Sequence, residues 1–168
     1  TFLSLYNIGS LVSFSGITEG IENSNYHLKT TKNDFILTLF EKRTDKEDLP
    51  FFINIMMYLN DREFKCPKPI IDNQGNYLQT LLGKPAVIVD FLEGKSKTKL
   101  TVQDNFAVGL TMAKMHICSK DYHMKRNNSL SISGWEELLY KCDTSISKTV
   151  LNKIEPRIIE EIKYSLDF

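Results

Sequence analysis

The sequence lacks the two best-known phosphate-binding motifs. No G-x-x-x-x-G-K-[ST] segment occurs in its 168 residues, and no G-x-G-x-x-G segment opens a helix. These absences argue against P-loop and dinucleotide-binding folds. Net charge is lacking as well, because 21 Lys and Arg residues balance 21 Asp and Glu residues. Without a net positive field to gather phosphate backbone or anionic lipid, neither nucleic acid nor a membrane is expected as a partner.

Cysteine is scarce and scattered. Cys66, Cys118 and Cys142 lie far apart, without a C-x-x-C pair or a His/Cys cluster around them. We expect reduced thiols and no zinc site. No apolar run approaches the roughly 18 residues of a membrane span, and no charged-then-apolar leader begins the chain. The expected location is the cytoplasm.

Three strands joined by a glycine-bearing loop are the most informative feature that is present. Period-two patterns predict antiparallel strands at residues 10–17, 24–31 and 34–42. Gly20 lies in the loop between the first two strands. Glycine permits positive φ and lets backbone N–H groups approach phosphate oxygens closely. Such a hairpin can cover the phosphates of a nucleotide, and the alternative is an ordinary turn.

The rest of the chain changes from strands to helices near residue 94. Apolar spacing predicts a helix from Asp45, and the prolines at 67 and 69 require an extended segment after it. The nearly continuous apolar run 85–92 predicts a central strand buried on both faces. Further predicted elements are short strands at 70–71 and 77–82, and helices at 101–118 (with its inward face at Phe106, Leu110, Ala113 and Met115 to Ile117), around 135–139, and at 147–166, kinked or split at Pro156.

This order of elements indicates an α+β fold like that of protein kinases. A sheet lobe of five or so antiparallel strands with one inserted helix occupies residues 1–93, and its hinge lies near 90–94. Residues 94–168 begin a helical lobe that is incomplete. In such a fold the nucleotide lies between the lobes, with its base against the hinge and its phosphates under the glycine-bearing loop.

Several motifs in order carry a more specific resemblance. The segments are Phe14–Tyr26, Phe35–Arg43, Asp48–Phe52, Cys66–Pro69 and Phe91–Gly94. With them the chain resembles, over essentially its whole length, the bacterial homoserine kinases of the aminoglycoside/choline phosphotransferase fold. The resemblance implies ATP-dependent phosphorylation of the L-homoserine hydroxyl in threonine biosynthesis, with ATP and Mg²⁺ as cofactors.

The resemblance also implies where ATP binds. The phosphate-covering loop would be formed by Gly20, Asn23, Ser24 and Asn25. The backbone of Phe91 and Leu92 would meet the adenine as the hinge, a role compatible with a plain buried strand end.

A lysine that the wider fold places in the third strand is replaced here. Thr38 occupies that position, where the lysine would hold the α- and β-phosphates. Lys42 lies four residues later and points to the same sheet face, because strand side chains alternate. We expect Lys42 or Thr38 to contact the nucleotide, and the alternative for Lys42 is a solvated strand end. Phe52 stands near the position of the helix glutamate that usually pairs with this lysine, which leaves Glu47 as a candidate by proximity.

The reaction centre of the family does not occur in the sequence. The family supplies its base and its metal ligands from a His-x-Asp-x-x-x-x-Asn loop and an Ile-Asp strand. The segment Asp121 to Asn127 has the wrong spacing and lacks the preceding histidine. We therefore expect no catalytic and no metal-binding residue of the reaction in this chain. Thr1 in place of methionine, and a helical pattern reaching Phe168 without a stop signal, suggest a piece of a longer protein.

Other interpretations remain open. His27, His116 and His123 are more readily structural or solvated than substitutes for the base. The chain could belong to another small-alcohol or aminoglycoside-type kinase of the same fold. It could also be a non-catalytic pseudokinase or interaction module, or a β-rich binding domain without a nucleotide. If it folds alone, its helical part should expose apolar surface. The sequence does not specify the oligomeric state.

Overall fold

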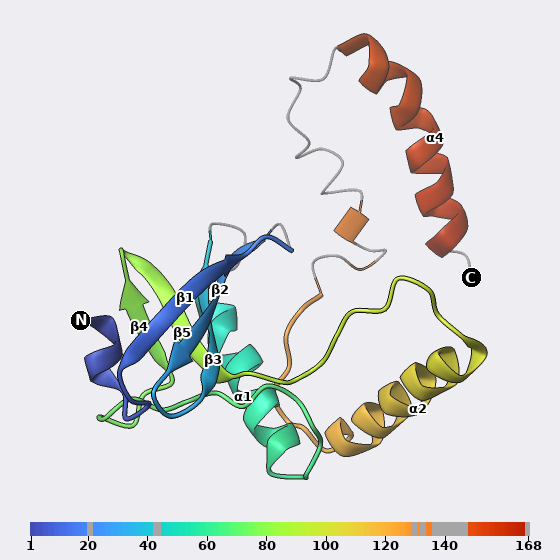
Figure 1. Cartoon of the computed structure of the whole chain (residues 1–168). Helices are drawn as coiled ribbons and strands as arrows, with labels where there is room; N and C mark the ends of the chain where they lie inside the picture. The colour runs from blue at the N-terminus through green and yellow to red at the C-terminus, as the bar shows by residue number, and fades with distance from the viewer. Residues whose placement is uncertain (20–21, 42–44, 129–130, 132–133, 136–147, 167–168) are drawn as a thin grey trace. The chain divides into compact units, whose positions relative to one another are not determined.

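The computed structural model describes residues 1–19, 22–41, 45–128, 131, 134–135 and 148–166 (Figure 1). The chain divides into two compact units, Thr1–Met124 and Lys125–Phe168. The first contains the sheet and the helices α1 (Leu49–Asn60) and α2 (Val102–Ser119). The second contains helix α4, Lys148–Leu166, which continues through Pro156 as one helix. The hinge and lobe boundary expected at 90–94 lie inside the first unit and stay a prediction.

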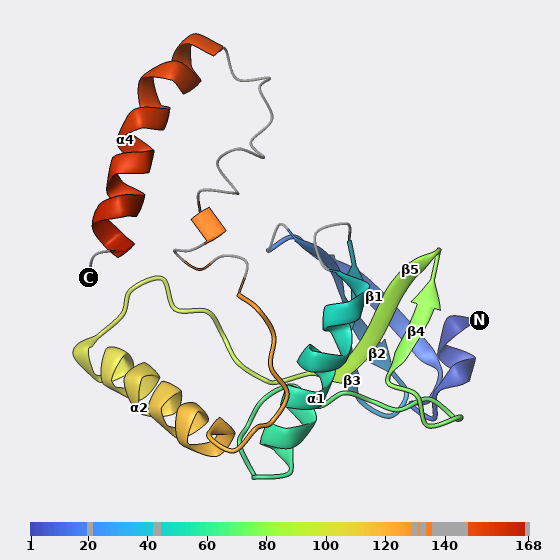
Figure 2. The same ribbon diagram turned by 180° about the vertical axis from the view of Figure 1, so that it is seen from behind.

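A five-stranded antiparallel sheet forms the body of the first unit (Figures 1 and 2). Its strand order is β1-β2-β3-β5-β4, so β3 and β5 are neighbours although a helix separates them in sequence. The order and the inserted helix confirm the predicted α+β sheet lobe. The strands are β1 (Leu11–Ile17), β2 (Asn23–Thr30), β3 (Asp34–Phe40), β4 (Leu78–Leu81) and β5 (Lys84–Asp90).

The short strand predicted at Ile70–Ile71 is wrong. Only an isolated bridge forms in this segment, between Pro69 and Val89. The backbone N–H of Ile70 donates to Ile88 O at 2.9 Å. Because prolines at 67 and 69 have no N–H to donate, the segment runs along β5 without building a ladder.

Alternation along the strands gives the sheet two different faces. One face carries a buried hydrophobic cluster, and the 3-10 helix η1 (Phe2–Leu5) packs against it. On the other side, Ile53 of α1 packs against Val87 and Val89. Strand β5 therefore contributes to both clusters and is buried on both faces, as predicted. The first cluster consists of Tyr6, Ile8, Leu28, Phe35, Leu37, Leu39, Ala86 and Ile88.

Helix α1, Leu49–Asn60, follows the 3-10 turn η2, Lys46–Asp48. Pro50 lies in its first turn, where the missing N–H costs no hydrogen bond. Leu49 is completely buried.

The segment after α2 returns to α1 through Tyr122. The Tyr122 ring lies 5.0 Å from the ring of Tyr58, and the Tyr122 hydroxyl donates to Phe51 O at 3.3 Å.

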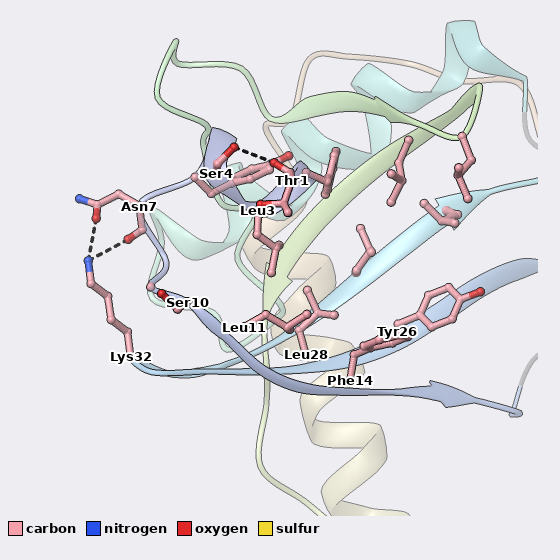
Figure 3. A pocket seen from close by; sticks show the side chains of 17 residues that line it. Thr1, Leu3, Ser4, Asn7, Ser10, Leu11, Phe14, Tyr26, Leu28 and Lys32 are labelled. Carbon is pink, nitrogen blue, oxygen red and sulfur yellow. Dashed lines mark hydrogen bonds between the residues drawn. The ribbon is translucent and has the colours of Figure 1, made fainter.

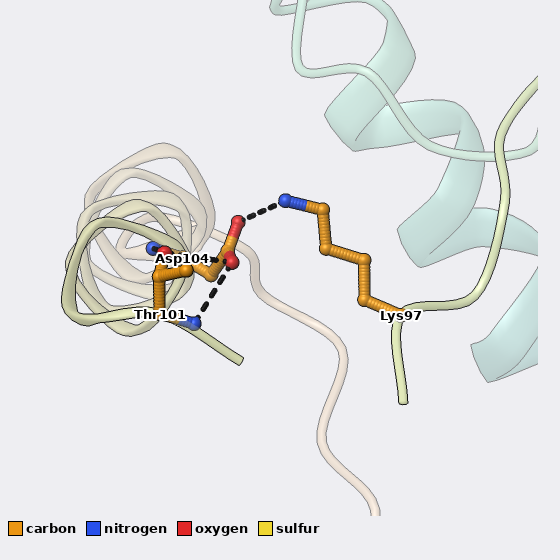
Figure 4. A network of polar contacts seen from close by, with 3 residues as sticks. All are labelled: Lys97, Thr101 and Asp104. Carbon is orange, nitrogen blue, oxygen red and sulfur yellow. Dashed lines mark hydrogen bonds and ion pairs between the residues drawn. The ribbon is translucent and has the colours of Figure 1, made fainter. Parts of the chain in front are cut away.

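Helix α2, Val102–Ser119, begins at a capping box (Figure 4). The Asp104 N–H donates to Thr101 Oγ1 at 3.2 Å, and the Thr101 N–H donates to Asp104 Oδ2 at 3.0 Å. The Lys97 ammonium donates to Asp104 Oδ1 at 2.5 Å, and this bond is the main cause of the lowered pKa of Asp104. The helix and its threonine N-cap are confirmed.

The inward face predicted for α2 is wrong. Phe106 is 72% exposed and Ile117 is 74% exposed, and no residue of the helix is buried. The residues at Leu110, Ala113 and Met115 are likewise not buried. A 3.6-residue period shows which side of a helix is apolar, but not what covers that side. The expected exposure of apolar surface is confirmed for this helix. Among the described residues no helix is both long and apolar enough to span a bilayer.

The short helix predicted around residues 135–139 lies almost entirely outside the described residues. Only 134 and 135 are described there, and both are helical.

Replacement of Leu49 by alanine should lower the free energy of unfolding by about 3 kcal/mol, because a completely buried leucine leaves a cavity. Urea unfolding followed by circular dichroism measures the change. Leu100→Ala is the control, because Leu100 is 61% exposed, and it should change stability by less than about 0.5 kcal/mol. Equal losses in the two variants would contradict the packing described here.

Asp72 should make stability depend on pH in the acid range. The backbone N–H of Asn76 donates to its carboxylate at 2.8 Å, as does that of Gln74, and the Gln79 amide donates as well. These bonds, that of Asn76 first, lower the pKa of Asp72 below its usual 3.8. A lowered folded-state pKa stabilises above the unfolded pKa, and this stabilisation is lost as pH falls through the folded pKa.

The stability advantage of the wild type over Asp72→Asn should therefore be full at pH 7 and shrink progressively below about pH 4. Unfolding curves in urea at pH 7, 4 and 3 measure it. A difference that stays constant across this range would show that the carboxylate charge contributes nothing.

Candidate functional site

The sheet face that packs against α1 carries a polar pair between apolar side chains. Asn25 of β2, Thr38 of β3 and Val87 of β5 are paired across the three strands. The Thr38 hydroxyl donates to Asn25 Oδ1 at 2.7 Å. Because this bond occupies the amide oxygen, the Asn25 Nδ2–H₂ group faces away from Thr38 and has no partner among the described residues. The pair thus offers oriented, uncharged hydrogen-bonding groups at the position where the wider fold is expected to have a lysine.

A second row lies next to this pair on the same face. His27, Ile36 and Val89 are paired across β2, β3 and β5. His27 Nε2 lies 3.0 Å from Asp34 Oδ2, and its ring lies 4.7 Å from that of Phe91. The second row therefore joins the sheet face to the segment that follows β5.

Asn23 belongs to the α1 face, because it lies two residues before Asn25 on β2 and strand side chains repeat with a period of two. Its Oδ1 accepts from the backbone N–H of Glu41 at 3.3 Å, which ties the start of β2 to the end of β3. Asn23, Asn25 and His27 thus follow one another along one face over about 13 Å of strand.

The Ser24 side chain lies on the opposite face of the sheet. Its hydroxyl donates to Glu41 Oε1 at 2.7 Å, and Lys84 Nζ lies 2.6 Å from Glu41 Oε2. The bond from Lys84, followed by that from Ser24, lowers the pKa of Glu41. Of the residues expected at the phosphates, the structure thus brings Asn23, Asn25 and Thr38 to one face and places Ser24 on the other.

Two expected site residues, Gly20 and Lys42, lie outside the described residues. The two residues near the expected helix glutamate are described. Glu47 lies in the η2 turn before α1, and Phe52 lies in α1 with its ring 5.8 Å from that of Phe51.

The segment after β5 has the backbone geometry of an open strand end. The Phe91 N–H donates to Asp34 O at 3.3 Å, and the Asp90 carboxylate accepts from the Lys68 N–H. The Leu92 N–H and C=O have no partner among the described residues. An open donor and acceptor at the end of a buried strand can hydrogen-bond the edge of a planar base.

The opposite face holds a cavity of about 780 Å³ (Figure 3). Phe14, Leu28 and Leu37 are among the mainly apolar side chains that line it. Lys32 lines it too, but its ammonium donates to Asn7 Oδ1 at 2.7 Å and to Asn7 O at 3.1 Å. A mainly apolar lining with its lysine already engaged does not suit a polyanion, which leaves the α1 face as the candidate site.

Metal ligands do not cluster in the described part of the chain. No group of three or more His, Cys, Asp or Glu residues there could hold an ion. The candidate site is therefore a set of hydrogen-bonding groups and rings, without a donor set for a metal.

Sequence reasoning missed the contact of His27 with Asp34 and Phe91. It treated His27 as structural or solvated. Period-two alternation signals only that His27 lies on the same face as Asn25, and it does not pair His27 with Phe91.

Comparisons with known proteins identify the family and the fold of this chain. A profile of the phosphotransferase enzyme family matches residues 13–142. Homoserine kinase of Brucella anthropi is 42% identical over 167 residues, which is 99% of this chain and 50% of that protein. Homoserine kinase of Rhodopseudomonas palustris (strain TIE-1) is 49% identical over 137 residues, 82% of this chain and 42% of that protein. The chain spans half or less of the length of these curated relatives.

Solved structures share the fold at low sequence identity. Amicoumacin kinase in complex with AMP-PNP and Ca²⁺ has a TM-score of 0.69 at 17% identity, over 96% of this chain and 51% of that one. Spectinomycin phosphotransferase in complex with ADP has a TM-score of 0.68 at 16% identity, over 99% and 55%. These likenesses confirm the expected fold class. Since the family profile spans most of the chain, from β1 past α2, the chain belongs to the phosphotransferase enzyme family.

Proposed function

We propose that this chain is the nucleotide-binding part of a homoserine kinase, which transfers the γ-phosphoryl group of ATP to the hydroxyl of L-homoserine in threonine biosynthesis. The observation that carries the proposal is the 42% and 49% identity to homoserine kinases over 99% and 82% of the chain. The fold is also shared with kinases solved with AMP-PNP and ADP. The polar pair Asn25 and Thr38 on the α1 face of the sheet offers a place for the nucleotide.

In this proposal the nucleotide lies along the α1 face. The adenine edge hydrogen-bonds the backbone of Phe91 and Leu92. The phosphates lie toward the hairpin, near the Asn25 amide and the Thr38 hydroxyl, where backbone N–H groups can also approach them.

Other proposed contacts involve residues near the hairpin. Asn23, Gly20 and Lys42 belong to the phosphate end, and Ser24 contributes through its backbone because its side chain is bonded to Glu41.

Mg²⁺ is proposed to accompany ATP. The described residues offer no set of carboxylates for it, so the proposal gives the ion no ligand in this part of the chain. Neutralisation of the phosphate charge is the chemistry that the ion supplies when bound.

A second candidate is another small-alcohol kinase of the same fold. It is favoured by the likeness to an amicoumacin kinase and a spectinomycin phosphotransferase. Substrate profiling of the protein that contains this chain, with homoserine, amino alcohols and aminoglycosides, separates the two.

ATP with Mg²⁺ should raise the melting temperature of the 168-residue chain, because a ligand that binds the folded state stabilises it. Thr38→Val and Asn25→Ala should each weaken ATP binding about five-fold, the effect of one hydrogen bond of about 1 kcal/mol. Isothermal titration calorimetry measures the dissociation constants. The double variant should lose less than the product of the two effects, because the side chains are bonded to each other.

Thr80→Val is the matched control, since Thr80 lies in β4, outside the row of Asn25 and Thr38. Wild-type affinity in the Thr38 and Asn25 variants would show that ATP binds elsewhere. A wild-type chain that does not bind ATP at all would refute the nucleotide site.

The 168-residue chain alone should not phosphorylate homoserine, because its sequence contains no His-x-Asp-x-x-x-x-Asn loop to provide the base. A coupled assay for ADP, run with ATP, Mg²⁺ and homoserine, should give the background rate. Turnover above this background would contradict the assignment of the reaction centre to other residues.

A further inference from the structure

The rings of His27 and Phe91 lie together on the α1 face, where strand β5 ends. We propose that His27 is the side chain that stacks on the nucleobase, and that Asp34 is the residue that positions it. The inference rests on the proposed ATP site. It adds a base-contacting residue that the sequence assigned to a structural or solvated role.

Three elements converge on His27. The residue comes from β2, Asp34 begins β3, and Phe91 follows β5. The His27 and Phe91 rings lie 4.7 Å apart with an interplanar angle of 36°. Asp34 accepts the Phe91 N–H at 3.3 Å through its backbone and contacts His27 Nε2 at 3.0 Å through its carboxylate. The backbone that would read the base edge and the ring that would cover its face are thus held together.

The His27 side chain is held in place and only partly covered. It is 32% exposed, and the side chain of Asp34 is 37% exposed. A histidine that served only the core would be enclosed, whereas this one keeps part of its surface open. Asp34 contacts one ring nitrogen and Phe91 lies beside the ring, so in this proposal the base stacks on the part of the ring that stays open.

The order of groups along the face matches the order of parts in a nucleotide. Leu92 and Phe91 lie at one end, His27 comes next, and Asn25 follows two residues further along β2, about 7 Å away. Strand β2 begins two residues before Asn25, at Asn23. A base at His27 would therefore leave the phosphates at Asn25 and Thr38.

Asp34 fixes the orientation of the imidazole. With Nε2–H donated to the carboxylate, rotation about the side chain is restricted and the ring plane is set against Phe91. A preoriented ring loses less conformational freedom when a base stacks on it. Loss of the carboxylate should therefore weaken base binding less than loss of the ring.

The test compares ligands with and without a base. Dissociation constants for ATP and for inorganic tripolyphosphate, each with Mg²⁺, are measured by calorimetry on the 168-residue chain. His27→Ala should weaken ATP binding about ten-fold, the effect of one stacked base, and leave tripolyphosphate binding within about two-fold. His27→Phe, which restores a flat ring, should recover ATP affinity to within about three-fold of the wild type.

Asp34 is tested in the same way. Asp34→Ala should weaken ATP binding about three-fold and leave tripolyphosphate binding unchanged, whereas Asp34→Asn, which keeps an acceptor oxygen, should lie closer to the wild type. His116→Ala is the matched control, because His116 is an exposed histidine of α2. Melting temperatures of all variants confirm that they are folded.

The outcomes separate this inference from the proposed function. ATP affinity unchanged in His27→Ala would overturn the stacking role while the ATP site stands. Equal weakening of ATP and tripolyphosphate would also overturn it, because His27 would then act on the sheet or the phosphates. A wild-type chain that binds neither ligand would overturn the proposed nucleotide site and this inference together.

Discussion

The register of β3 between β2 and β5 is the constraint on which the two faces of this structure depend. Thr38 is paired with Asn25 on one side and with Val87 on the other. Because side chains alternate, a slip of one residue would exchange the polar pair with the buried leucines 37 and 39. The apolar positions 35, 37 and 39 resist that slip, since it would carry them out of the core. The core on one face thereby fixes the geometry of the candidate site on the other.

Asp34, the first residue of β3, joins β2 to the segment that follows β5. Asp34 contacts His27 through its side chain and accepts from Phe91 through its backbone. At the other end of the same strand, Glu41 is bonded to Ser24 and Lys84 on the opposite face. The two ends of β3 are thus tied to both neighbouring strands by polar contacts, while its middle is held by packing.

The sequence was sufficient to predict the elements whose pattern is local. Period-two runs located β1, β2 and β3, the nearly continuous apolar run 85–92 located β5, and the Thr101 cap located the start of α2. Ile70–Ile71 was mistaken for a strand because apolar residues suggest burial, while ladder formation depends on which N–H groups remain, and only an isolated bridge at Pro69 forms. The α2 face and the contact of His27 with Phe91 depend on segments distant in sequence, which alternation alone does not pair. Ser24 was grouped with its neighbours in sequence, although adjacent strand residues point to opposite faces.

The Thr101 capping box has a consequence for the order in which the chain folds. Its two partners are three residues apart, so the first turn of α2 can close without waiting for distant segments to meet. Closing that turn is the costly step of helix formation, and elongation is cheaper once it is made. The helix can therefore form early in folding, before its exposed apolar side chains make tertiary contacts.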